Sequence, residues 1–372
     1  MEIRSRIVSD VVEQKEEEIS EEYNCCAEMM QRALSLLGSA WSGMQQFLPK
    51  TIKFYKQQAL VHRTYDERHK NLNELRKLFP DLQANDLVLS CDLATAKEFH
   101  ALYSTLFTGI SYREFKEVST VLADKLCVAM GNEGTISDFE YLMSIHLLKE
   151  TLVLIAPNLI NDADLLENYA QAVFRLFQED EDAEKTIEYS SVESFLALNS
   201  PFVKRMRENG FSERSIEVTL YDLFSTTLDP MLEFAKSAFT NIGSRLDMQK
   251  RLQLELACGN RTYLDQMLIE SLRLRPPIEA FGSLKCKIGD LAQNSRVTGY
   301  GQYNVNKFDP DRINSIPPHP KLIPFLPFGY GPNGCPFSLY VMDVVRTTMI
   351  AIFKTKLITC DRAKDSYFTE PK

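Results

Sequence analysis

The chain has 372 residues, a formal net charge of −9 and only 15 glycines. This net negative charge argues against nucleic acid as a main partner, because phosphate contacts need clustered lysine and arginine. The composition, 44% apolar and 25% charged, is typical of a soluble globular protein, and the scarcity of glycine favours helices.

The compartment is expected to be the cytoplasm. The first 22 residues are rich in glutamate, so they do not resemble a signal peptide. The apolar stretch at residues 33–48 is too short and too polar for a membrane span of roughly 20 residues. The eight cysteines include no CxxC pair, which argues against a zinc ribbon or a dithiol site and favours a reducing environment.

Hydrophobic periodicity predicts a mainly helical body. Residues 1–60 are helical in pattern, but nothing in them indicates a role. A helix at 71–79 and a short strand at 86–90 follow. Further helices are predicted, in chain order, at residues 94–106, 112–130, 136–155, 162–178, 188–209 with a break near Pro201, 213–242 with a kink at Pro230, 248–257 and 262–274.

The pattern changes after Pro276 and Pro277. Residues 278–336 are rich in glycine, proline and asparagine, with only short strand-like pieces. One more helix is predicted at 337–353. The expected order is therefore a long helical body, an irregular section and a final helix.

The most informative stretch is the loop Leu326-Pro-Phe-Gly-Tyr-Gly-Pro-Asn-Gly-Cys335, which ends just before the final helix. Glycines allow tight turns and a close approach to a flat ligand. Backbone N–H groups at a helix start stabilise a thiolate, which can then serve as an axial ligand of haem iron. Taken alone, the loop fits a buried structural cysteine equally well.

Two charged motifs precede this loop. Glu270 and Arg273 lie three residues apart on one predicted helix face, where they can form an ion pair. Arg312 follows in the irregular section. Each motif alone is common in unrelated proteins.

At these three places together the sequence resembles the cytochrome P-450 family. Phe328 and Gly331 lie seven and four residues before Cys335, as in the haem-binding signature of the family. Glu270 and Arg273 match its E-x-x-R helix. Arg312 matches the arginine that completes a buried Glu-Arg-Arg network, so these three charged residues are expected to be structural.

The resemblance implies a mainly α fold with small β-sheets, forming a single large haem domain over residues 61–372, preceded by the extension 1–60. It implies haem b with Cys335 as the ligand of the iron. It also implies an oxidoreductase, and most simply a monooxygenase that uses dioxygen, a small-molecule substrate and a ferredoxin- or flavodoxin-type electron donor.

Further positions match less closely. Tyr112 and Lys116 stand where a histidine or tryptophan and an arginine bind haem propionates in the family, and Asn333 stands at another propionate position. Thr226 matches the alcohol of the distal proton relay. Ser225 replaces the acid of that relay, which puts the usual delivery of protons to dioxygen in doubt.

Two other functions therefore stay open. One is haem-thiolate chemistry without dioxygen activation, as in a peroxygenase, dehydratase or isomerase. The other is a non-catalytic relative that keeps the fold as a binding or recruitment module. Neither the substrate nor the redox partner can be read from the sequence.

Overall fold

The computed structural model describes residues 98–99, 101–103, 110–132, 134–136, 138–178, 187–275, 277, 307–311, 328, 335, 337–361 and 366–370. The predicted extension 1–60, the helix at 71–79, the strand at 86–90 and most of the irregular section lie outside these residues.

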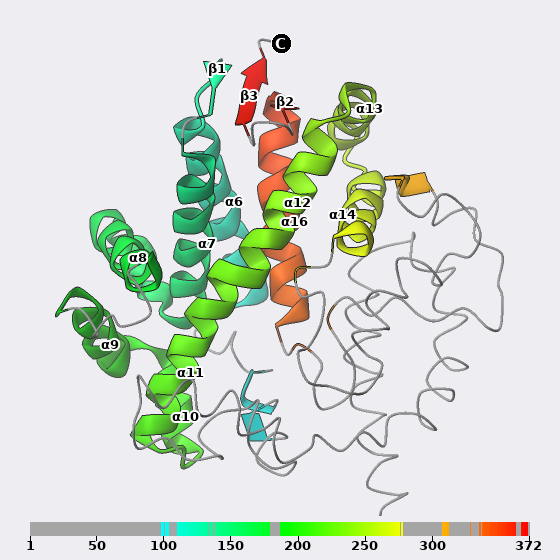
Figure 1. The fold of residues 1–372 in the computed structure, drawn as a ribbon. Helices are drawn as coiled ribbons and strands as arrows, with labels where there is room; N and C mark the ends of the chain where they lie inside the picture. Colours follow the sequence, from blue (N-terminus) through cyan, green and yellow to red (C-terminus); the bar gives the residue numbers. More distant parts are fainter. Residues whose placement is uncertain are drawn as a thin grey trace, which may run out of the picture.

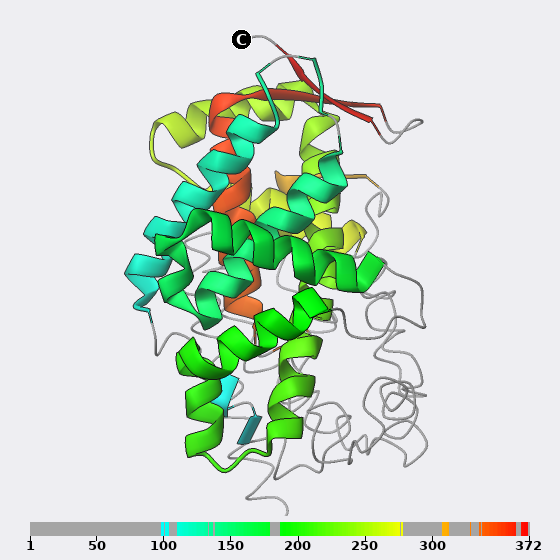
Figure 2. The same ribbon diagram turned by 90° about the vertical axis from the view of Figure 1, so that its left-hand side faces the viewer.

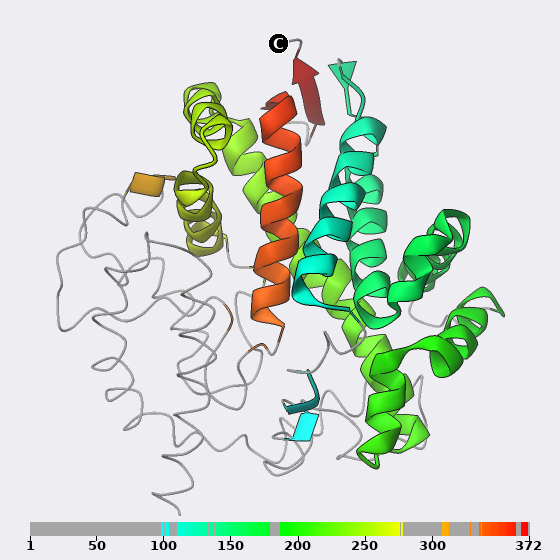
Figure 3. The same ribbon diagram turned by 180° about the vertical axis from the view of Figure 1, so that it is seen from behind.

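Four helices form the centre of the protein. They are α6 (Tyr112–Ala129), α7 (Phe139–Ile155), α12 (Leu232–Gly243) and α16 (Ser338–Thr355). Helix α6 packs against α7 and α16, and α12 packs against the same two helices, so the four form a closed ring (Figures 1 and 3). Helix α7 is apolar on nearly all sides and buried along most of its length, as expected for a helix surrounded by others.

Five further helical segments cover one side of this core. They are η4 (Pro157–Asn161), α8 (Ala163–Gln178), α9 (Ile187–Asn199), α10 (Pro201–Glu208) and α11 (Glu213–Thr226). Figure 2 shows the molecule from this side. Ser200 and Ser212 cap α10 and α11 by accepting hydrogen bonds from backbone N–H groups three residues ahead. The predicted break near Pro201 is confirmed, because α9 ends at Asn199.

The predicted long helix with a kink at Pro230 is also confirmed. Helix α11 continues into the π-helical turn η5 (Thr227–Met231) and then into α12. Pro230 has no N–H to donate to the carbonyl four residues earlier, so the regular ladder cannot pass through it. The buried Thr227 lies at the start of this turn.

Helices α13 (Leu246–Ala257) and α14 (Thr262–Leu274) pack against α12 and α16. A small antiparallel sheet lies at one end of the core, with β1 (Gly134–Thr135) and β2 (Leu357–Asp361) on either side of β3 (Ser366–Glu370). The side chain of Gln249 joins α13 to β2, since it hydrogen-bonds to both the N–H and the C=O of Ile358, at 2.9 and 2.7 Å.

The sheet accounts for the main differences from the sequence prediction. The predicted helix start at residue 136 is wrong, because Gly134 and Thr135 pair with β3 and α7 begins only at Phe139. The two strands after residue 356 were not predicted. In the part of the chain that the structure describes, no helix is long and apolar enough to cross a lipid bilayer.

Candidate haem-thiolate site

Cys335 lies three residues before α16, at the end of its loop. Its backbone N–H donates a 2.7 Å hydrogen bond to the carbonyl of Phe328, which closes the loop on itself. The half-buried Phe328 packs against the hydrophobic core. Phe337 packs against Tyr103, with ring centroids 4.6 Å apart. These contacts lie next to the start of α16, which is the lower end of that helix in Figure 1.

The thiol of Cys335 is free, and three effects act on its protonation. Burial raises its pKa to about 11, a hydrogen bond from the backbone N–H of Phe337 lowers it, and the charge of Asp222 raises it. The N–H of Phe337 at the start of α16 favours the thiolate, as a haem-thiolate loop requires. A bound iron cation would supply the positive charge that the thiolate otherwise lacks. The donor chemistry therefore fits a haem iron.

Asp222 belongs to an open polar face of α11. Leu223, Phe224 and Thr227 on the other face are buried in the core. Positions 222, 225 and 226 follow the i, i+3, i+4 spacing of a single helix face, and all three residues there are exposed or partly exposed.

Both predicted relay residues lie on this face. Thr226 is exposed, and its hydroxyl donates to the carbonyl of Leu223 in its own helix, at 3.1 Å. Ser225 is partly exposed. Asp222 was not among the residues predicted for the site. The sequence feature that could have pointed to Asp222 is its position four residues before Thr226, because that spacing puts both side chains on one helix face.

Glu270 and Arg273 form the predicted pair and are buried, with 1% and 0% exposure. Arg273 binds the carboxylate through two hydrogen bonds, and it also donates to the carbonyl of Lys307. The N–H of Asp309 donates to the same carboxylate. The predicted third member, Arg312, lies outside the described residues, as do Gly331 and Asn333.

Tyr112 and Lys116 lie against α16. The hydroxyl of Tyr112 donates to the carboxylate of Asp343, and the ammonium of Lys116 lies 4.6 Å from the centre of the Tyr112 ring. Asp343 is eight residues beyond Cys335, roughly 12 Å along the chain at helical rise. The hydroxyl of Tyr112 is thus engaged within the protein, and a contact with a haem propionate remains a prediction.

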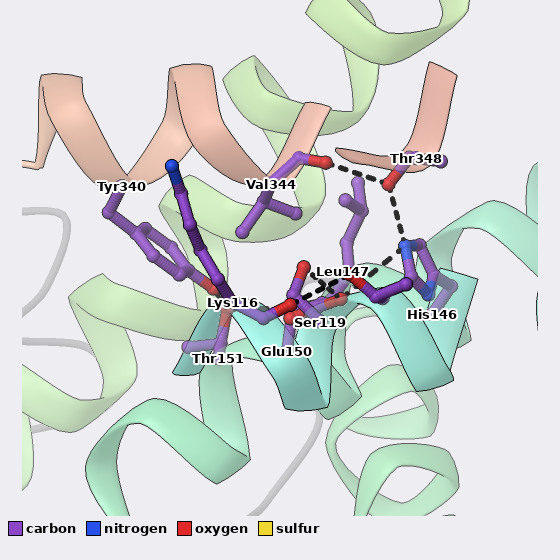
Figure 4. A network of polar contacts seen from close by, with 10 residues as sticks. Lys116, Ser119, His146, Leu147, Glu150, Thr151, Tyr340, Val344 and Thr348 are labelled. Atoms are coloured by element: carbon purple, nitrogen blue, oxygen red, sulfur yellow. Dashed lines mark hydrogen bonds and ion pairs between the residues drawn. The ribbon is translucent and has the colours of Figure 1, made fainter. Parts of the chain in front are cut away.

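A second polar cluster lies inside the four-helix core (Figure 4). Ser119 donates to Glu150 at 2.9 Å, and His146 lies 2.8 Å from the hydroxyl of Thr348. Burial raises the pKa of Glu150 to about 8 and lowers that of His146 to about 3, so both are neutral near pH 7. None of these four residues was predicted from the sequence to have a special role.

A short hydrogen-bond chain lies beside that cluster. The hydroxyl of Thr151 lies 3.0 Å from that of Thr227 and 2.9 Å from that of Tyr340. It therefore links α7 to the π-helical turn that follows Thr226 and to α16 five residues after Cys335. These buried contacts hold α7, the π-helical turn and α16 together.

The described residues form a mainly helical fold, and solved structures identify it. A six-coordinated cytochrome P450 from Thermus thermophilus is similar, with a TM-score of 0.55 and 16% identity over 85% of this chain and 90% of that one. The cyanobacterial CYP120A1 with bound retinoic acid has a TM-score of 0.54 and 13% identity over 80% of this chain and 83% of that one. A zebrafish cytochrome P450 with progesterone has a TM-score of 0.54 and 14% identity over 78% of this chain and 81% of that one. The chain thus has the cytochrome P450 fold. It matches no protein-family model, and no curated protein matches its sequence.

Proposed function

We propose that the chain binds haem b through the thiolate of Cys335 and acts as a haem-thiolate oxidoreductase. The observation that carries the proposal is the position of this free thiol: it ends a loop closed by the hydrogen bond to Phe328, lies just before α16 and accepts a hydrogen bond from the N–H of Phe337. Haem held by a thiolate supplies one-electron and dioxygen chemistry, with electron density that favours O–O cleavage.

Other residues would hold the macrocycle. Phe328 and Gly331 would shape the loop beneath the ring, and Asn333 and Lys116 would donate to its propionates, with Lys116 stacked on the ring of Tyr112. The buried pair of Glu270 and Arg273 would act from a distance by fixing the segment at Lys307 and Asp309. These are positioning roles, since the pair is fully enclosed by protein.

Within this class we propose a monooxygenase that acts on a small molecule, with dioxygen and a ferredoxin- or flavodoxin-type donor. Ser225 cannot serve as a charged acid near neutral pH. The hydroxyl of Thr226 donates to Leu223 of its own helix, so its proton is directed away from the pocket. Water or a substrate group would then deliver the protons.

The same two residues favour a second candidate, a haem-thiolate enzyme that needs no dioxygen relay, such as a peroxygenase. Turnover of a panel of small hydrophobic molecules by the haem-loaded protein separates the two. Product formed with a ferredoxin system and dioxygen, but not with hydrogen peroxide alone, supports the monooxygenase. Product formed only with peroxide supports the second candidate. A haem-loaded protein inert under both conditions would contradict an oxidoreductase.

A further inference from the structure

An aromatic side chain lies beside the candidate iron ligand. Phe337 follows Cys335 by two residues and directly precedes α16. Its ring contacts that of Tyr103, with centroids 4.6 Å apart and ring planes inclined by 54°. Phe337 is partly exposed, whereas Tyr103 is buried, with 5% exposure. Protein therefore covers only part of Phe337, and Tyr103 packs on the covered side.

Further aromatic rings hold Tyr103 in place. It stacks on Phe202 of α10 and on Phe99, with centroid distances of 6.3 and 6.1 Å. Both of these phenylalanines are buried, with 1% and 0% exposure. Side chains in a close-packed core cannot move aside without leaving a void, which costs free energy. The ring of Phe337 thus rests on a rigid support.

A flat cofactor bound through the sulfur of Cys335 would lie close to this ring. Two residues of chain span at most ~7 Å. The N–H of Ser338 also donates to the carbonyl of Cys335, at 3.4 Å, so the chain turns here and keeps Phe337 beside the cysteine. Aromatic rings form favourable stacked and edge-to-face contacts with other π-systems, and a porphyrin presents a large π-system.

We propose that Phe337 contacts the haem macrocycle directly and that Tyr103 is a positioning residue that holds Phe337 against it. This inference rests on the proposed function, because it requires haem bound through Cys335. It adds an aromatic wall beside the sulfur to the loop residues that would lie beneath the ring. Phe337 touches the cofactor, whereas Tyr103 acts through Phe337 from the buried side.

Ring-current shifts in the NMR spectrum of the haem-loaded full chain test the contact. The carbon monoxide complex of the ferrous protein is diamagnetic, and in it the haem strongly shifts the signals of protons that lie against the macrocycle. Phenylalanine isotope-labelled in the ring supplies the signals, and Phe337→Tyr identifies that of Phe337 by its loss. We expect a strongly shifted signal for Phe337, and Tyr103→Leu should move it. An ordinary position for this signal, or a signal unmoved by Tyr103→Leu, would overturn the inference.

Transfer of haem to excess apo-myoglobin measures what the contact contributes. Phe337→Leu should raise the rate of haem dissociation about 2-fold to 10-fold, the range of an aromatic contact, and Phe337→Tyr should keep the native rate. Phe177→Leu is the matched control, because Phe177 is also partly exposed and packs on a tyrosine, Tyr221, at 5.0 Å, but lies on α8. It should leave the rate unchanged. Equal rates for the two leucine variants would also overturn the inference, whereas a native chain that takes up no haem contradicts the proposed function instead.

Discussion

The guanidinium of Arg273 donates two hydrogen bonds, of 2.7 and 2.8 Å, to the carboxylate of Glu270 in a site closed to solvent. The geometry is bidentate, and two backbone groups from residues 307 and 309 also bind the pair. The pair therefore joins α14 to a segment more than thirty residues further along the chain.

Arg273→Ala should lower the free energy of unfolding by about 3–5 kcal/mol, because it leaves the Glu270 carboxylate buried without its counter-charge. Chemical denaturation of the purified protein measures this. Arg275→Ala is the control, since Arg275 is two residues away and exposed. If both variants unfolded at the same denaturant concentration, the buried pair would not have the structural role assigned to it.

Glu150 should make stability depend on pH. Its pKa is about 8 in the folded protein against an ordinary value of 4.5. Folding thus favours the neutral form of Glu150. The resulting contribution to the free energy of unfolding is fully present below about pH 4.5 and is lost as pH rises through about 8. Glu150→Gln cannot ionise and keeps an acceptor for Ser119. Between about pH 5 and pH 8 the native protein should lose unfolding free energy relative to this variant, by up to about 1.4 kcal/mol per pH unit.

Glu208→Gln is the control for this measurement, because Glu208 is exposed. Its stability difference from the native protein should stay flat over the same range. A flat difference for Glu150→Gln as well would mean that the Glu150 carboxyl is ionised in the folded core.

Tyr112→Phe distinguishes a contact with Asp343 from a contact with haem. Since the hydroxyl already donates to Asp343, its removal should destabilise the fold by about 1–2 kcal/mol and leave the haem dissociation rate unchanged. Transfer of haem to an excess of apo-myoglobin reports that rate. Much faster loss of haem would assign the hydroxyl to a propionate.

Thr226→Ala should leave the ratio of product formed to dioxygen consumed nearly unchanged, because the hydroxyl donates to its own helix. Ser225→Asp, which puts an acid on the same face, should raise that ratio if water limits proton delivery. Oxygen-electrode traces combined with product analysis measure both. A collapse of the ratio in Thr226→Ala by orders of magnitude would show that the alcohol takes part in the relay.

Local signals predicted most of the described helices. The span 262–274 was predicted with the observed bounds, and Pro201 and Pro230 marked the breaks that the structure contains, because proline removes an N–H wherever it stands. The sheet was missed for the opposite reason. Gly134 and Thr135 form a strand only because β3, more than two hundred residues later, pairs with them.

In the candidate site, too, some residues can be predicted from local sequence motifs and others only from the folded structure. Cys335, Glu270 and Arg273 stand in motifs whose spacing is visible in the sequence. Asp222 and Glu150 do not, since their importance arises from which groups surround them after folding. A carboxylate on a helix is ordinary in sequence, and the burial that raises its pKa, as for Glu150, exists only in the folded protein.

The central claim is that the sulfur of Cys335 binds haem iron, and the absorption spectrum of the reduced, carbon monoxide-bound protein tests it most directly. The native chain and Cys258→Ser, which alters an exposed free cysteine, should both show the red-shifted Soret band of thiolate-ligated haem. Cys335→Ser should lose that band. A native spectrum without it, or an unchanged band in Cys335→Ser, would contradict the account.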